Sequence, residues 1–389
     1  MTLSNEQKLA IGADQNLAVL VGNGLSVGFN PSLSLVSITE EMMRRIERDD
    51  EGGYDAVNAM RAIAERALPN GATSSEDFEV LVGAFGSERE TLSSFRDLAK
   101  LIRPTSKKLR RALKRASAFA EEVRDAGVSH VLEVIYERSY AAEDEMEQLR
   151  EFVRRVTGDI EGDVTIANLN YDTLMLAALM AVREGQFADM AHGGRRTSIT
   201  LGGQNYRVPV LRRTDDFPNK RIKLLHLHGS LTYWTAAKVD KFVKLNTSML
   251  RENDIFGSIR QRTTKLRPVI VLANQKDKRG AVGRYPFALA YEVFKKSLER
   301  STRWLIVGYS FRDEVINEML RDVFVADDGL VNVLVVTKGE GLSRSEVETA
   351  LGWDEETDGN SVSWLSFFRD GAESLMSSDE WDTFRNLAG

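Results

Sequence analysis

Six short, mostly apolar runs rich in β-branched residues punctuate the chain, and turn residues bound each of them. Most of the runs are continuously apolar, which is typical of strands covered by helices on both faces. Helical patterns separate the later runs, so the sequence predicts an α/β fold with a doubly wound, parallel, Rossmann-like sheet. The runs cover residues 17–21, 164–167, 222–227, 268–272, 304–307 and 331–336, and the helical patterns cover 172–183, 285–298 and 313–325.

Residues 31–161 interrupt this alternation, because they contain helical patterns and no convincing strand. We therefore predict an inserted helical subdomain over 31–161, with residues 1–30 and 162–389 forming the α/β domain. Helices are expected at 38–48, with Thr39 as its cap, at 75–84, and around the apolar positions Leu109, Leu113, Ala116, Ala120 and Val123.

Two further segments of the α/β domain have weaker patterns. The connection 186–220 is polar and rich in glycine and arginine, which predicts an irregular segment or a small hairpin. The tail is expected to place a strand at 362–367 between two helices.

The composition excludes several classes of protein. The 389 residues include 58 acidic and 52 basic side chains, for a net charge of −6, and no cysteine. A chain without cysteine has no disulfides, no catalytic thiol and no zinc site built on thiolates. A secretory leader and a membrane-spanning apolar stretch are also missing from the pattern, so a cytoplasmic location is expected.

Charge argues against direct nucleic-acid binding, with one local exception. The segment 107–115 holds six lysines and arginines around Leu109 and Leu113. On a helix the two leucines would face inward and the basic residues would form a solvated face. A contact with DNA or with an acidic protein is the alternative.

A glycine-rich loop follows the first predicted strand, at Gly22-Asn23-Gly24-Leu25-Ser26. Glycines there allow a tight turn and a close approach of the backbone to a pyrophosphate. The spacing to the next glycine, Gly28, is one residue longer than in the usual dinucleotide fingerprint. A simple turn without a ligand therefore remains open from this loop alone.

Polar side chains follow three further strands. Asn168, Asn170 and Asp172 come after the second strand, His228 after the third, and Gly308 and Ser310 after a later one. Taken alone, Asn170 or Asp172 could be a helix cap, and His228 could be a core histidine. His226 and His228 together could in principle chelate a metal. Because ligands of parallel sheets bind at the carboxyl ends of the strands, the four segments together predict one shared cleft and no metal site.

Taken in order, these segments resemble the sirtuin superfamily, and specifically its zinc-free branch in bacterial anti-phage defence. Gly22 to Ser26 is similar to the family's Gly-Ala-Gly-x-Ser loop, and Asn168 to Asp172 is similar to its Thr-Gln-Asn-Ile-Asp segment. His228-Gly229-Ser230 resembles the His-Gly-Ser that supplies a catalytic histidine, and Gly308-Tyr309-Ser310 resembles the Gly-Thr-Ser turn. The resemblance spans about residues 17–337 and leaves the inserted helical region and the tail uncovered.

The resemblance implies NAD as the substrate. By its motifs, the catalytic residues would be Asn170, His228 and Asp172, and the NAD-binding residues would be Gly22, Asn23, Gly24, Ser26, Asn170, Asp172, Gly308 and Ser310. Asn170 would hold the ribose hydroxyls and a water molecule, His228 would act as a general base, and Asp172 would orient the loop.

Departures from the family favour hydrolysis of NAD over deacylation. Deacylating sirtuins carry a four-cysteine zinc module, which this chain lacks, so no zinc is expected. We therefore expect an NAD glycohydrolase that releases nicotinamide and ADP-ribose and depletes NAD during defence. The alternatives are an NAD-dependent deacylase and a non-catalytic NAD- or ADP-ribose-binding scaffold. The resemblance also implies a homo-oligomer and pairing with a HerA-type hexameric ATPase.

Overall fold

The computed structural model describes residues 16–49, 52–67, 78–101, 107–142, 146–218, 220–236, 239–272, 278–327 and 331–387. Its centre is a seven-stranded parallel sheet with the strand order β12-β11-β10-β1-β2-β6-β3. The predicted α/β, doubly wound fold is therefore confirmed. The strands are β1 (Leu17–Val21), β2 (Val164–Asn168), β3 (Phe187–Asp189), β6 (Ile222–His226), β10 (Arg303–Val307), β11 (Asn332–Val336) and β12 (Leu365–Phe368).

Strand β1 lies in the middle of this sheet and is buried along its whole length. It pairs in register with β2 on one side and β10 on the other, so that Val21 lies opposite both Asn168 and Val307. The chain leaves β1 in one direction and returns later on its other side. Such a reversal of strand order opens a crevice at the carboxyl ends of the strands.

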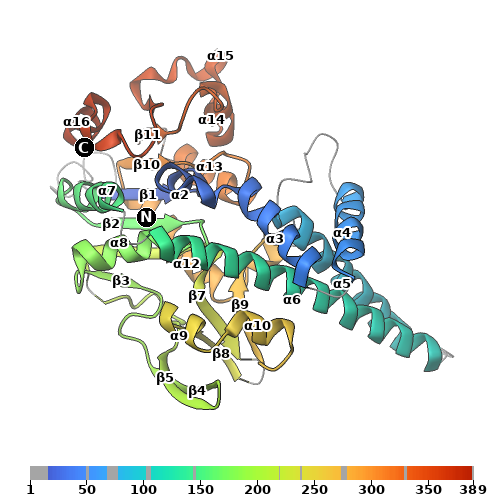
Figure 1. The fold of residues 1–389 in the computed structure, drawn as a ribbon. Helices are drawn as coiled ribbons and strands as arrows, with labels where there is room; N and C mark the ends of the chain where they lie inside the picture. The colour runs from blue at the N-terminus through green and yellow to red at the C-terminus, as the bar shows by residue number, and fades with distance from the viewer. Residues whose placement is uncertain are drawn as a thin grey trace.

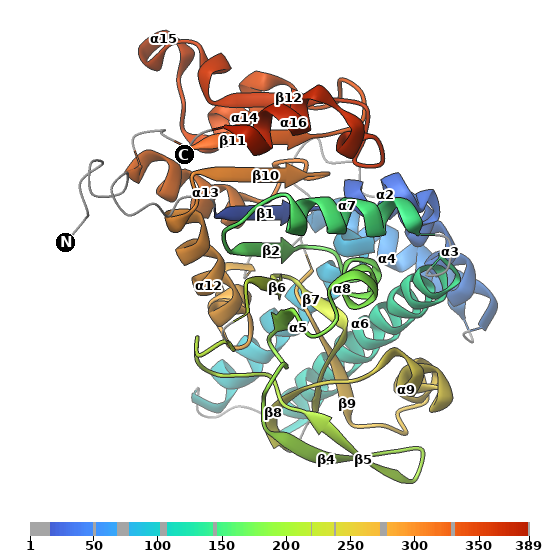
Figure 2. The ribbon, with the colours of Figure 1, turned by 90° about the vertical axis from the view of Figure 1, so that its left-hand side faces the viewer.

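Helices cover both faces of the sheet and divide the core into two clusters. Figure 2 shows α7 and α8 in front of β1 and β2, with α12 and α13 on the opposite side. The continuous apolar patterns of the strands follow from this double cover. The covering helices are α7 (Glu147–Gly158), α8 (Leu174–Arg183), α12 (Phe287–Arg300), α13 (Glu314–Ala326), α14 (Arg344–Leu351) and α16 (Asp379–Asn386).

Between β1 and α7 the described residues form only helices, which extend away from the carboxyl ends of the strands (Figures 1 and 2). We call α3 to α6 the helical arm. The helix α7 lies within the predicted insertion 31–161 but packs on the sheet. The division of the chain at residues 30 and 161 therefore stays a prediction. The elements are α2 (Asn23–Phe29), the short 3₁₀ helix Pro31–Leu33, α3 (Leu35–Asp49), α4 (Gly53–Ala67), α5 (Phe78–Leu101) and α6 (Lys107–Ala142).

Two details of the arm differ from the prediction. Thr39 is not a cap, because α3 begins at Leu35; its hydroxyl donates to Leu35 O and accepts from the Phe78 amide. Leu109 is half exposed rather than turned inward, although it lies on the long helix α6. The predicted start at Ser75 lies outside the described residues.

A smaller antiparallel sheet, β8-β7-β9, follows β6. The apolar run 268–272 belongs to it as part of β9, which pairs with β7, and not to the parallel sheet. An apolar run has the same appearance in either sheet, so its pattern does not reveal its partner. These elements are β7 (Gly229–Ala236), β8 (Val239–Lys244), α9 (Thr247–Glu252), α10 (Ile255–Arg260), β9 (Leu266–Ile270) and α11 (Lys278–Val282).

The connection 186–220 contains the predicted hairpin, formed by β4 (Arg196–Leu201) and β5 (Gln204–Pro209). In the tail, the strand predicted at 362–367 begins later, at Leu365, because residues 361–363 form a 3₁₀ turn. A short helix, α15 (Glu355–Asp358), and the 3₁₀ turn Leu375–Ser377 complete the tail. Among the described residues, no helix has both the length and the apolar character needed to cross a membrane.

Candidate functional site

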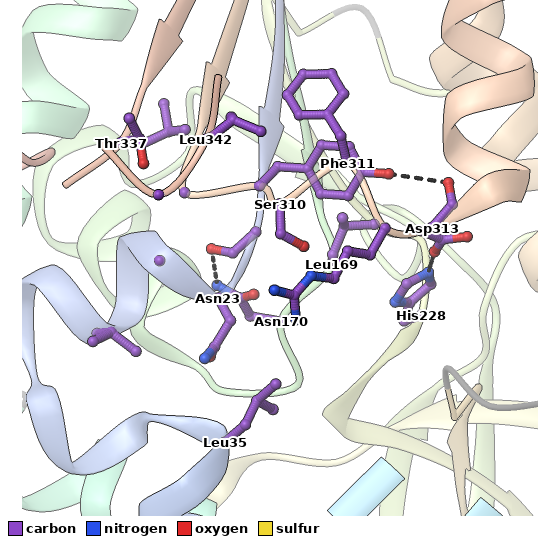
Figure 3. Close-up of a pocket in the computed structure, with 18 of the residues that line it drawn as sticks. Asn23, Leu35, Leu169, Asn170, His228, Ser310, Phe311, Asp313, Thr337 and Leu342 are labelled. Carbon is purple, nitrogen blue, oxygen red and sulfur yellow. Dashed lines mark hydrogen bonds and ion pairs between the residues drawn. The ribbon is translucent and has the colours of Figure 1, made fainter. Parts of the chain in front are cut away.

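A cavity of about 1440 Å³ lies at the carboxyl ends of β1, β2, β10 and β11. In Figure 3, Asn23, Asn170 and Ser310 lie near its middle, His228 and Asp313 on one side, and Thr337 and Leu342 on the other. The helical arm contributes a further wall. The lining includes Gly22, Asn23, Gly24, Asn170, Asp172, His228, Gly308 and Ser310, together with Leu35, Ile38, Phe78, Glu79 and Ile135 from the arm.

The glycine loop after β1 packs directly on the turn after β10. The Gly22 amide donates to Val307 O and the Gly24 amide to Gly308 O, both at 2.9 Å. A Cβ on Gly24 would lie 2.6 Å from Gly308 Cα. These glycines are therefore required for contact between the two loops, and the amides of Gly22 and Gly24 bond to that second loop. Asn23 lines the cavity beside them.

Asn170 is held by a chain of hydrogen bonds that begins at Asp172. The Ser26 hydroxyl donates to Asp172 Oδ2 at 2.6 Å. Asn170 Nδ2 donates to Ser26 Oγ at 2.8 Å and to Gly22 O at 3.0 Å. Because both amide hydrogens are used, Oδ1 is the atom of Asn170 that can accept a hydrogen bond from a ligand. Ser26 is itself buried, and its hydroxyl holds the side-chain amide of Asn170 in place.

Asp172 lies where β2 gives way to α8. Its Oδ1 accepts at 3.0 Å from the amide of Leu174, the first residue of the helix. Burial raises the pKa of Asp172, while the hydrogen bonds from Ser26 and the Leu174 amide oppose that rise. Both carboxylate oxygens therefore have protein donors.

His228 follows β6, in the two-residue turn before β7. It does not share a strand face with His226, because β6 ends at His226. His228 Nε2 lies 3.0 Å from Asp313 Oδ2, and Lys278 Nζ lies 2.5 Å from the same oxygen. Burial lowers the pKa of His228; Asp313 opposes this shift and Lys278 adds to it. A neutral imidazole at pH 7 is the result.

The turn after β10 is fixed by its own side chains. Tyr309 Oη donates to Asn317 Oδ1 at 2.7 Å, and Asn317 Nδ2 donates to Phe311 O at 2.7 Å. Phe311 has a left-handed backbone with φ of 53°, an uncommon conformation for a large side chain. This network exposes Ser310 to the cavity and sets the start of α13 at Asp313.

Several lining residues were not predicted from the sequence. Asp313 and Lys278 come from segments distant from His228, and Glu79 comes from the arm, where it accepts from Tyr171 Oη at 2.6 Å. Thr337 and Leu342 follow β11. Asp313 carried one signal in the sequence, because an aspartate that caps a helix after a buried strand lies at the ligand-binding edge of such a sheet.

The described residues contain no group of three or more His, Asp or Glu side chains that could hold a metal ion. His226 is fully buried behind the cavity, where it makes an edge contact with Tyr233 at 5.3 Å. Burial lowers the pKa of His226 to about 4. It therefore behaves as a neutral core residue.

Comparison with known protein families finds a match for part of the chain. The family described as "SIR2-like domain" matches residues 164–354. The chain contains a SIR2-like domain. The matched range includes Asn170, His228, Lys278 and Asp313, whereas the glycine loop after β1 lies before it. A SIR2-like domain implies NAD-related enzyme activity and the use of NAD.

The chain is similar to a solved structure described as "Structural Basis for the Mechanism and Regulation of Sir2 Enzymes". The match covers 98% of this chain and 97% of that chain. The two share 11% identity with a TM-score of 0.33, a likeness too distant to carry an argument about the SIR2-like domain. No curated protein matches the chain.

Proposed function

We propose that the protein is an NAD glycohydrolase that converts NAD and water to nicotinamide, ADP-ribose and a proton. The observation that carries this proposal is a single cavity that joins Asn170 and His228 to Thr337 and Leu342. Pockets for drug-sized ligands occupy roughly 300–1,000 Å³. At about 1440 Å³, this cavity has the volume for a dinucleotide.

In this proposal the dinucleotide extends along the carboxyl edge of the sheet. Gly22, Asn23, Gly24, Gly308 and Ser310 would face its phosphates and ribose, with Asn23 and Ser310 offering side-chain hydrogen bonds. The adenosine would lie toward Thr337 and Leu342. The nicotinamide ribose would then lie between Asn170 and His228.

Asn170 would bind the reacting ribose through Oδ1. A ribose hydroxyl or the attacking water can donate to this oxygen, since both amide hydrogens already bond to Gly22 O and Ser26 Oγ. A fixed acceptor holds the reacting atoms without reorganisation during the reaction. Asp172 and Ser26 would act through Asn170 by fixing its orientation.

His228 would act as the general base. The C1′–N1 bond of the nicotinamide ribose breaks, and its electron pair neutralises the pyridinium ring. The water oxygen forms a bond to C1′, and a proton from this water moves to His228. A neutral imidazole is suited to this step, because the leaving group needs no acid.

Hydrolysis is favoured over deacylation by the composition. Zinc modules of deacylating sirtuins are built on cysteine thiolates, and the sequence has no cysteine. Water is then the acceptor that requires no further binding surface.

The test is product analysis with the purified full chain. We expect nicotinamide and ADP-ribose in equal amounts, and Asn170→Ala or His228→Ala to lower kcat by about 100-fold or more. His192→Ala and Asn205→Ala are matched controls, since both residues lie away from the cavity lining. Unchanged rates in Asn170→Ala and His228→Ala would contradict the assignment. Release that requires an acyl-lysine peptide would favour the deacylase, and NAD binding without turnover would favour the scaffold.

We propose that the biological outcome is depletion of NAD in anti-phage defence, with a homo-oligomer and a HerA-type ATPase controlling the enzyme. The support is the family resemblance and the harm that an unregulated NAD hydrolase would cause its host. Light scattering of the purified chain, and NAD levels in infected cells carrying the active chain or Asn170→Ala, test the two parts separately.

A further inference from the structure

Two buried charged residues at the edge of the cavity have no part in the reaction described above. Lys278 and Asp313 approach each other within 2.5 Å, and their side chains are only 8% and 10% exposed. His228 Nε2 lies 3.0 Å from the same carboxylate oxygen. A buried ion pair of this kind is costly to desolvate, so its position beside the proposed base points to a role there.

We infer that Asp313 is the positioning residue of His228, and that Lys278 balances the Asp313 charge so that the ring is oriented without becoming a permanent cation. This inference rests on the proposed function of His228 as a base. It adds two residues to the machinery and assigns each a separate task.

Asp313 is suited to positioning because it is itself fixed from several sides. Its Oδ1 accepts from the Val315 amide at 3.2 Å and caps α13. Its backbone oxygen accepts from Tyr309 Oη at 3.0 Å. Its Oδ2 thereby faces His228 and Lys278, and Figure 3 shows the imidazole next to the Asp313 carboxylate. The 3.0 Å approach is an ion-pair distance, although no well-aligned hydrogen bond joins these two side chains in the described residues.

Lys278 is needed because a carboxylate alone would do more than orient the ring. A buried carboxylate beside an imidazole favours the protonated, cationic form, which cannot accept a proton from water. Lys278 opposes that effect from α11. Burial raises the pKa of Asp313, but His228 and Lys278 more than offset this and hold it below its usual range. Asp313 therefore stays ionised while His228 stays neutral.

Four other charged residues that line the cavity have partners of their own. Asp172 accepts from Ser26 and the Leu174 amide, and Glu79 accepts from Tyr171. Arg279 forms an ion pair with Glu318, and Glu314 lies within 3.7 Å of Arg321. Beside burial, Lys278 and Asp313 are thus the charged pair that acts on the titration of His228.

The test is an NMR titration of the histidine side chains in the full chain, which has only four histidines. Because this readout needs no turnover, it is separate from the proposed reaction. Lys278→Met should raise the titration midpoint of His228 by about one pH unit or more, and Asp313→Asn should lower it. Lys278→Arg should restore the native midpoint. Arg279→Met and Glu314→Gln are matched controls that change one charge at the neighbouring position, and they should leave the midpoint in place.

The acidic limb of the pH profile of kcat should move with the midpoint in each variant. A His228 midpoint that stays unchanged in both Lys278→Met and Asp313→Asn overturns the inference, as does a lower midpoint in Lys278→Met. If Lys278→Met fails to fold, Asp313→Asn decides alone, and an unchanged midpoint there is sufficient to reject the inference. Absence of NAD hydrolysis with the expected midpoints would instead reject the proposed function and leave the charge balance standing.

Discussion

Asp172 and Asp313 occupy similar places on the two sides of the cavity, yet the partners of their second oxygens differ. Each follows a strand of the parallel sheet, and the Oδ1 of each accepts from an amide in the first turn of the next helix, that of Leu174 or of Val315. The second oxygen of Asp172 accepts from the hydroxyl of Ser26. The second oxygen of Asp313 meets the ammonium of Lys278.

The pKa shifts of the two carboxylates differ in direction. Burial disfavours the charged form of both carboxylates, and it prevails at Asp172, whose pKa is raised. At Asp313 the contacts with His228 and Lys278 overcome burial, and the pKa is lowered. The comparison shows how one local motif, an aspartate cap at a strand-to-helix turn, serves two tasks. One carboxylate anchors a neutral hydrogen-bond chain to Asn170, and the other anchors a charged contact to His228.

The largest expected effect comes from Gly308→Ala, which would disrupt both sides at once. Gly308 has φ of +61°, and a Cβ there would lie 2.2 Å from the Leu25 amide nitrogen. The strained backbone and the clash should lower the free energy of unfolding by about 3 to 5 kcal/mol. Gly339→Ala is the control, because its φ is also positive but no described atom lies within 4 Å of the added Cβ. It should cost about 1 to 2 kcal/mol. Equal losses in thermal or urea unfolding would show that the two loops do not pack as described.

A smaller effect with opposite signs is expected when each aspartate is replaced by asparagine, which keeps the cap. Asp313 has a lowered pKa, so its contribution to stability is present above its unfolded value of about 3.9 and is lost as the pH falls below it. Asp172 has a raised pKa, so the folded state loses stability as the pH rises above about 3.9.

Asp313→Asn should therefore be less stable than the native chain at pH 7, by about 1 to 3 kcal/mol, with a gap that stays constant down to about pH 4 and begins to narrow below it. Asp172→Asn should show the reverse trend and gain relative to the native chain as the pH rises. Urea unfolding between pH 3 and 7 measures both. Parallel pH trends in the two variants would remove the distinction between the two sides.

Much of the fold was predictable because buried parallel strands have a strong local signature. The runs at 17–21, 304–307 and 331–336 match β1, β10 and β11 within one residue. What the patterns could not provide is pairing between distant segments. The strand at 268–272 has the same apolar appearance in either sheet, and the Thr39 hydroxyl meets an amide 39 positions later.

The candidate site divides in the same way. Asn170, Asp172 and His228 stand directly after strands, where the sequence alone places polar side chains at the ligand-binding edge. Lys278 lies on the short helix α11, 35 positions before Asp313 in the sequence. Only the packing of α11 places Lys278 beside Asp313, next to His228. The role of Ser26 was also hidden, because a hydroxyl after a glycine turn predicts contact with a phosphate. Its observed position, between Asp172 and Asn170, depends on how β1 and β2 pair.

The smallest expected effect is that of Ser26→Ala, which changes only the hydrogen-bond chain from Asp172 through Ser26 to Asn170. Removing the hydroxyl leaves Asn170 with its bond to Gly22 O and leaves Asp172 with its cap, so the fold should be nearly unchanged. Asn170 would lose one of the two acceptors that orient it, and kcat should fall by about 3- to 10-fold, in line with about 1 kcal/mol for one hydrogen bond. The pH profile should keep its native midpoint, because Lys278 and Asp313 still determine the charge of His228. A shifted acidic limb in Ser26→Ala would mean that the two sides of the cavity titrate together.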